Sequence, residues 1–262
     1  MYMRISTDEL ELWRIENEFT NHPHSHDEQV QITIPIQGTC HFTHEQRSYS
    51  LDSGNSLIQY PRENHHFQIG GDSSVIIIQL QANRLEYNNR PVELMPRHYV
   101  DPRDVLGQFR DWTSRLLARD PSDRLSVQET ECSVVSYLSR VFGDRSDSLS
   151  ERPDRRLVVS DPYMTRVLDY IHDHFRTSIS VDDLAALALQ SRYHFIRSFK
   201  SATGMSPYQY VMHTRIEEAK RKLRSTSMSV TEIAMYLGFS SASQLYRAFM
   251  NAVGTTPERY RK

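Results

Sequence analysis

Two arginines, Arg197 and Arg247, occupy the same position in two copies of one pattern within the last hundred residues. Arginine can form paired hydrogen bonds with the edge of a guanine in the DNA major groove, so such a pair suggests base recognition. The copies are offset by 49 residues at Ser180 and Ser229, and by 50 at the arginines. The second copy therefore has one extra residue, which we place in a turn near Gly238.

The agreement between the copies extends well beyond the arginines. It comprises a serine, an alanine, two large apolar residues, the arginine between them, a glycine and a proline: Ser180, Ala185, Phe195, Phe199, Arg197, Gly204 and Pro207 in the first copy, and Ser229, Ala234, Leu245, Phe249, Arg247, Gly254 and Pro257 in the second. Alanine and phenylalanine at helical spacing usually indicate only a helical core. The shared pattern favours two related DNA-binding units over ordinary helical hairpins.

Each copy predicts a helix-turn-helix unit. The serine is the expected N-cap of a short first helix, and acidic residues in the next turn satisfy free amides and suit the helix dipole. A turn follows at residues 189–191 and 238–240. In the second helix the two large apolar residues share the buried face, which leaves the arginine on another face. The glycine ends this helix, and a serine or threonine followed by proline begins the next one.

Three stretches of this region are specific: residues 197–210, 215–223 and 233–240. Through them the chain resembles the AraC/XylS-type transcription regulators from about Ser180 to Tyr260. The resemblance implies two recognition helices in successive major-groove segments of double-stranded promoter DNA, and RNA polymerase as a protein partner. Residues 207–224 would join the units as a helix about 27 Å long, compatible with a spacing of about 34 Å between those segments.

The resemblance also assigns DNA-contacting residues to recognition helices at about 192–200 and 242–250. They are Arg192, Tyr193, Ile196, Arg197 and Lys200 in the first helix, and Ala242, Ser243, Tyr246 and Arg247 in the second. For each arginine, a phosphate contact or a solvated surface position stays open. Ile196 departs from the family, which more often has a small polar residue there. Met250 and Asn251 stand where a basic residue is usual, so we expect the second unit to hold phosphate more weakly.

The charge distribution supports a division of labour between the two ends of the chain. Residues 160–262 contain 14 Lys and Arg against 9 Asp and Glu, a net charge of +5, whereas residues 1–159 carry 17 against 24, a net charge of −7. A basic module beside an acidic one is typical of a DNA-binding domain attached to a sensor that does not bind DNA.

The first 85 residues predict a β domain. Short apolar or alternating stretches occur at residues 30–34, 40–42, 48–51, 57–60 and 75–80, separated by glycine, proline and other turn residues. The resemblance implies a cupin-like sensor, which is a β-barrel or jelly roll with a pocket between its sheets. The predicted fold class is α+β and multidomain, with this barrel and some helices followed by an all-α domain of two helix-turn-helix units.

Histidines in the β domain could bind a metal ion. His24, His26 and His66 match three ligand positions of metal-binding cupins, but Val30 and Gln31 stand where their glutamate is expected. Three imidazoles can still bind zinc or copper. Because the carboxylate is missing, we expect no metal cofactor, and instead a pocket lined by His24, His26, Gln31 and His66 that binds a small-molecule effector.

Two amphipathic helices are expected after the barrel, at about residues 102–118 and 125–142. The apolar stripe of the second comprises Val127, Val134, Val135, Leu138, Val141 and Phe142. The resemblance implies that this stripe pairs two chains into a homodimer; covering the barrel is the alternative. The expected domains are a sensor at 1–100, a helical dimerisation segment at 101–143, a polar linker at 144–159 and a DNA-binding domain at 160–262.

These observations predict a ligand-responsive transcription regulator that is not an enzyme. Activation is the commoner outcome in the family, and repression stays open. Two alternatives remain: a metal-dependent cupin enzyme with a DNA-binding tail, and a regulator that needs no ligand. Cys40 and Cys132 suggest no disulfide framework, and no stretch approaches membrane-spanning length, so we expect a bacterial cytoplasmic protein that joins the nucleoid when bound.

Overall fold

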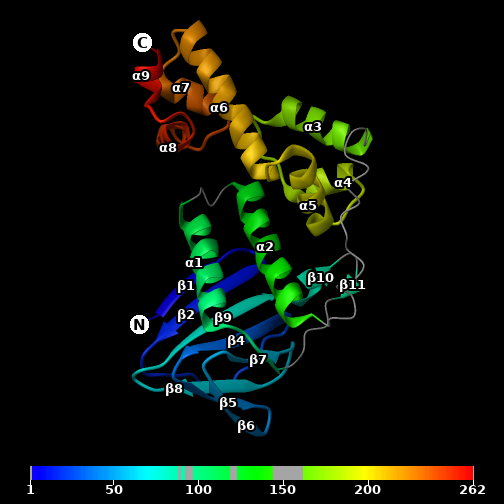
Figure 1. The fold of residues 1–262 in the computed structure, drawn as a ribbon, viewed down its shortest axis with the longest axis vertical. Helices are drawn as coiled ribbons and strands as arrows, with labels where there is room; N and C mark the ends of the chain where they lie inside the picture. The colour runs from blue at the N-terminus through cyan, green and yellow to red at the C-terminus, as the bar shows by residue number, and fades with distance from the viewer. Residues whose placement is uncertain (1, 88–89, 92–96, 119–122, 144–161, 262) are drawn as a thin grey trace. The chain divides into compact units, whose positions relative to one another are not determined.

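The computed structural model describes residues 2–87, 90–91, 97–118, 123–143 and 162–261, and the predicted linker at 144–159 lies outside them. The chain forms two compact units. The N-terminal unit comprises residues 1–116 and 130–152, and the C-terminal unit comprises 117–129 and 153–262. The predicted α+β fold class is confirmed, with antiparallel sheets in the first unit and helices in the second (Figure 1). No helix of the described ranges is both long and apolar enough to cross a membrane.

Two antiparallel sheets build most of the N-terminal unit. The larger has the order β1 (Tyr2–Ser6), β2 (Leu10–Glu16), β9 (Ser74–Gln81), β4 (Gln29–Gln37), β7 (Asn55–Gln59) and β12 (Arg97–Tyr99). The smaller has the order β3 (Phe19–Thr20), β8 (His65–Ile69), β5 (Thr39–His44) and β6 (Arg47–Asp52). A short 3-10 helix, η1 (Ala82–Arg84), and the pair β10 (Glu86–Tyr87) and β11 (Arg90–Pro91) follow β9.

Both sheets contribute to one apolar core. Its members are Ile15, Leu57, Val75 and Ile77 from the larger sheet and Cys40, Phe42, Leu51, Phe67 and Ile69 from the smaller. Because successive side chains of a strand point to opposite faces, the even-numbered residues of β2, β4 and β9 lie on the other face of the larger sheet. Several of them are buried as well, for example Leu12, Ile32 and Ile78.

Helix α1 (Pro102–Ala118) and the part of α2 (Arg124–Phe142) from residue 130 onward lie beside the larger sheet (Figure 1). The Trp112 indole donates a hydrogen bond to Ser133 Oγ at 3.2 Å, and Thr7 Oγ1 donates to Glu131 Oε1 at 2.6 Å. Val134 and Leu138 of the predicted dimerisation stripe are completely buried within the single chain. These two side chains are therefore not available to a second chain, whereas Val127 and Val141 of the same stripe are only partly buried.

The C-terminal unit is entirely helical in its described part. Its helices are α3 (Pro162–His174), α4 (Val181–Leu187), α5 (Arg192–Thr203), α6 (Pro207–Ser225), α7 (Val230–Tyr236), α8 (Ala242–Val253) and α9 (Pro257–Arg261). The predicted caps are confirmed at Ser180, Ser206 and Ser229, each of which forms a reciprocal capping box with the residue three positions later. Gly204 and Gly254 end α5 and α8 in the left-handed conformation.

The second helix-turn-helix packs its turn against the segment between α3 and α4. Gly238, at φ +76°, comes so close to the backbone of Arg176 that an added Cβ would lie 2.1 Å from the Arg176 carbonyl oxygen. The buried Arg215 of α6 donates from Nε to the Phe175 carbonyl at 2.6 Å, and its guanidinium lies 5.6 Å from the centre of the Phe239 ring. This junction links the segment after α3, helix α6 and the turn between α7 and α8.

We expect Gly238→Ala to lower the free energy of unfolding of the C-terminal unit by about 2–5 kcal/mol, because left-handed strain and overpacking add. Gly254→Ala is the matched control, since Gly254 has φ +77° but no atom within 4 Å of an added Cβ. It should cost only about 1–2 kcal/mol. Urea unfolding of the full chain, followed by circular dichroism at the helical band, measures both. Equal losses in the two variants would show that the methyl group added at Gly238 meets no steric cost against the backbone of Arg176.

Candidate nucleic-acid interface and polar end of the barrel

The two recognition helices have the predicted buried and exposed faces. Phe195 and Phe199 of α5 are completely buried, whereas Arg197 and Lys200 are exposed. In α8, Arg247 is exposed at the equivalent position. Helical periodicity places each arginine away from the two large apolar residues that flank it. The two guanidinium groups therefore lie on the solvent face of their helices, as base or phosphate recognition requires.

Three of the expected contact residues of α5 and α8 are less accessible than their family positions suggest. Tyr193 is only 9% exposed, so little of its ring is accessible to bases. Ile196 and Ala242 are partly buried. Ser243, which is equivalent to Tyr193 in the second copy, is exposed.

Arg192 and Tyr246 are held by partners inside the unit. Arg192 donates two hydrogen bonds to Asp182 of α4, one of them from a terminal guanidinium nitrogen at 2.6 Å, and its side chain is 14% exposed. The Tyr246 hydroxyl donates to Glu258 of α9, and this hydrogen bond lowers the pKa of Glu258. Both side chains hold neighbouring helices together.

His194 is not among the residues assigned from the family pattern. It is exposed and lies three residues before Arg197, so the two side chains share a face of α5. Helical spacing from Arg197 is the signal that would have found it. In the second copy its place is taken by Gln244, whose side-chain oxygen accepts a hydrogen bond from the Ser240 amide at 2.9 Å.

A row of three buried glutamines crosses the larger sheet of the N-terminal unit. Gln79 of β9, Gln31 of β4 and Gln59 of β7 are paired in register. Gln79 Nε2 donates to Gln31 Oε1 at 2.6 Å, and Gln31 Nε2 donates to Gln59 Oε1 at 3.0 Å. Thr33 Oγ1 also donates to Gln59 Oε1. As odd-numbered residues these side chains point to the same side as the apolar core between the sheets, and they form its polar end.

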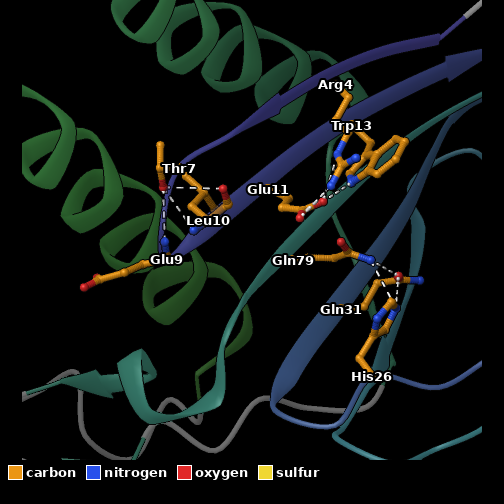
Figure 2. A network of polar contacts seen from close by, with 9 residues as sticks. All are labelled: Arg4, Thr7, Glu9, Leu10, Glu11, Trp13, His26, Gln31 and Gln79. Atoms are coloured by element: carbon orange, nitrogen blue, oxygen red, sulfur yellow. Dashed lines mark hydrogen bonds and ion pairs between the residues drawn. The ribbon is translucent and has the colours of Figure 1, made fainter. Parts of the chain in front are cut away.

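Three histidine rings lie beside this row. His26 Nε2 is 3.2 Å from Gln31 Oε1 and 3.1 Å from Gln79 Nε2, and Figure 2 shows the three side chains converging. The ring centres of His24 and His65 are 4.5 Å apart, and that of His26 is 5.0 Å from His24 and 5.2 Å from His65. Of the residues expected at this site, His24, His26 and Gln31 are therefore close together.

His66 is not part of this cluster, and His65 takes its place. In β8, His65 and Phe67 are buried and His66 between them is only partly buried, because neighbouring residues of a strand face opposite sides. The expected position of the third imidazole was thus wrong by one residue. Gln59 and Gln79 were missed as well, since their proximity to Gln31 depends on strand register, which the sequence does not state directly.

Burial favours the neutral form of His26 and His65. Burial, together with the neighbouring His24 and His26, lowers the pKa of His65 to about 4, although the hydrogen bond with the Glu63 carbonyl acts in the opposite direction. Burial, then the neighbouring His24, also lowers the pKa of His26. At neutral pH both rings therefore carry a lone pair on one nitrogen.

Two buried polar atoms of this end have no hydrogen-bond partner among the described residues: Gln59 Nε2 and His65 Nε2. A buried polar atom without a partner costs about 1–3 kcal/mol, and native structures contain few of them. Both atoms belong to the same group of glutamine and histidine side chains. Such a site can give hydrogen bonds to, or coordinate, a bound ligand.

Comparisons with known proteins agree with this arrangement. Residues 9–131 match a family described as the AraC-like ligand binding domain, and residues 184–262 match a family described as a helix-turn-helix domain. An uncharacterised HTH-type transcriptional regulator of Staphylococcus aureus (strain COL) is 26% identical over 242 residues, which cover 88% of this chain and 31% of that protein. The chain thus spans about a third of the length of that relative.

Two further similar proteins differ in how much of this chain they cover. The probable transcriptional regulator LumQ of Photobacterium leiognathi is 25% identical over 264 residues, which cover 98% of each chain. The crystal structure of the DNA-binding domain of AdpA in complex with a target DNA is 36% identical and covers 39% of this chain and 91% of that one, with a TM-score of 0.37. With an AraC-like ligand-binding domain followed by a helix-turn-helix domain, this chain belongs to the AraC/XylS-type transcription regulators.

Proposed function

We propose that this protein binds promoter DNA sequence-specifically through α5 and α8, and that a small molecule at the polar end of the barrel controls its activity. The observation that carries the DNA-binding proposal is the pair of exposed arginines at equivalent positions of two capped helix-turn-helix units. Helix α6 has 19 residues and is about 28 Å long. Together with the junction at Gly238 and Arg215, it keeps the two units at a constant spacing, as recognition of successive major-groove segments requires.

The polar end of the barrel is suited to an uncharged molecule with hydroxyl or amide groups. Its glutamines offer neutral donors and acceptors, and its buried imidazoles are neutral as well. Glu11, which is paired with Gln79 in register, accepts hydrogen bonds from Arg4 at 2.9 Å and from the Trp13 indole at 3.0 Å (Figure 2). The charge of Glu11 is therefore satisfied within the larger sheet.

We propose further that the bound protein acts in the bacterial cytoplasm as an activator that contacts RNA polymerase. Membership of the AraC/XylS type supports this proposal. A homodimer would bring two such DNA-binding units to one promoter. Because most of the stripe on α2 is buried, the dimer would use its partly buried members, Val127 and Val141, or residues outside the stripe.

Arg197→Ala and Arg247→Ala are each expected to weaken binding to the preferred site by about 1–3 kcal/mol and to relax the base preference at one position, because a bidentate contact with guanine is lost. The site is first selected from random duplexes, and affinities are then measured by fluorescence anisotropy at fixed salt. Arg47→Ala, which removes the same charge from an exposed position of β6, is the matched control. An equal loss of affinity on every sequence would assign the arginines to phosphate instead.

Tyr193 and Ser243 test which equivalent positions face DNA. Tyr193→Ala should lower the free energy of unfolding by about 3–5 kcal/mol, while Tyr193→Phe should leave the base preference unchanged, because the ring packs inside the unit. Ser243→Ala should change stability by less than about 0.5 kcal/mol. Thermal melting and the same anisotropy assay check these values. A new base preference for Tyr193→Phe would place its hydroxyl at the DNA.

A melting screen against uncharged metabolites tests the effector site. A ligand at 100 times its Kd stabilises the folded chain by about 2.7 kcal/mol, which raises Tm. We expect Gln59→Leu to abolish the rise, because the buried amide would no longer be available to the ligand. Thr39→Val removes an exposed hydrogen bond to Asp52 in the same unit and should leave the rise intact. A ligand that stabilises the Gln59→Leu variant as much as the natural chain must bind elsewhere.

A further inference from the structure

We propose that His24, His26 and His65 bind one divalent transition-metal ion of the zinc or copper class in the N-terminal unit. Each residue presents one ring nitrogen, and these three atoms all lie within 4.8 Å of one another. Among the described residues, these three histidines are the group whose potential ligand atoms lie this close together. A metal 2.0–2.1 Å from each nitrogen needs nitrogen separations of about 3.4 Å, so the rings would close on the ion by about an ångström.

The backbone holds two of the ligands opposite each other. The His24 amide donates to the His65 carbonyl at 3.1 Å, and the His65 amide donates to the His24 carbonyl at 2.8 Å. This reciprocal pair attaches the segment before β4 to the start of β8. Because both hydrogen bonds are part of the fold, the rings meet without any ligand to draw them together. His24 and His26 are only partly buried, so they keep room to close on an ion.

The second ring nitrogens of His24 and His65 are committed to backbone carbonyls. His24 Nδ1 lies 2.8 Å from the His22 carbonyl oxygen, and His65 Nδ1 lies 3.0 Å from the Glu63 carbonyl oxygen. A carbonyl can only accept, so Nδ1 carries a proton in both rings and Nε2 is the nitrogen that can face a metal ion. Metal-binding histidines are oriented in this way, with the nitrogen opposite the metal donating to a carbonyl or carboxylate.

The lone pair of His65 has no other use in the described structure. His65 is 1% exposed, and its Nε2 is buried without a hydrogen-bond partner. A metal ion would satisfy this atom, whereas a purely structural role leaves its cost unexplained. The flat face of the ring is already covered by Phe42, with ring centres 5.9 Å apart and planes 9° from parallel. The ring is therefore fixed in orientation.

The donor set decides the class of ion. Three imidazoles suit zinc, copper, nickel or iron, whereas magnesium and calcium prefer oxygen ligands. With three protein ligands, a fourth position stays available to water or another small ligand. The glutamate of metal-binding cupins is replaced in this chain, so the site would carry the full charge of the ion. This inference does not depend on DNA binding, which uses other residues in the other unit.

The test uses the full chain, stripped with a chelator and dialysed. Titration with Zn²⁺ by calorimetry, and metal analysis after desalting, should give one equivalent per chain and a raised Tm. Co²⁺ should produce visible ligand-field absorption typical of nitrogen ligands. His65→Phe keeps a ring over Phe42 but removes the ligand nitrogen, and we expect it to weaken Zn²⁺ binding by on the order of 100-fold or more, since even second-shell changes cost 10–100-fold.

His66→Phe is the matched control, because it changes the neighbouring histidine on the other side of the same strand. It should bind Zn²⁺ like the natural chain. His24→Ala, at a partly exposed position, repeats the test if His65→Phe fails to fold. The proposal is overturned if the natural chain retains no metal, if His65→Phe and His24→Ala bind it unchanged, or if His66→Phe loses it equally.

Discussion

The relative placement of the two helix-turn-helix units depends on one buried guanidinium. Arg215 of α6 is 7% exposed and donates hydrogen bonds to the carbonyls of Phe175 and Thr177, on the segment between α3 and α4. Its other face meets Phe239 in the turn of the second unit. A buried charge is tolerated only where hydrogen bonds satisfy it, so this segment, α6 and the second turn are constrained together. The spacing of α5 and α8 follows from that constraint.

The same junction explains why the two copies differ in their turns. In both, the helix ends in a Schellman arrangement, in which Gln190 donates to Ala185 and Phe239 donates to Ala234. The left-handed position is Leu189 in the first copy, at φ +53°, and Gly238 in the second. Leu189 is 74% exposed, so its turn has room for a side chain at a modest cost in strain. The second turn meets the backbone of Arg176 and has room for none.

Signals within short stretches of sequence predicted the helices of the C-terminal unit well. The features that were missed depend on contacts between residues far apart in the sequence. Cap serines, ending glycines and a 3.6-residue period act within one helix, so the starts of α4 to α8 follow from the sequence, while α5 and α8 run three residues beyond their expected ends at 200 and 250. Whether Tyr193 or Ser243 is buried depends on neighbouring helices. The exchange of His65 for His66 is the error expected in a strand, where a slip of one residue reverses every side chain. Likewise, the apolar stripe on α2 indicates that one side of this helix is covered, but it does not indicate which part of the protein covers it.

The interior of the barrel is apolar at one end and polar at the other. Burial of the apolar end stabilises the fold, whereas burial of the polar end also removes polar groups from water, which costs free energy. Phe42, Phe67 and Ile77 fill their end as any hydrophobic core does. At the other end, burying amides and imidazoles gains little even where every hydrogen bond is made, and Gln59 and His65 each retain a buried atom without one. Stability alone would favour apolar residues there. A ligand that completes these contacts binds only the folded chain, and the hydrogen bonds that it supplies to Gln59 and His65 contribute to its affinity. The stability of this unit then depends on ligand concentration.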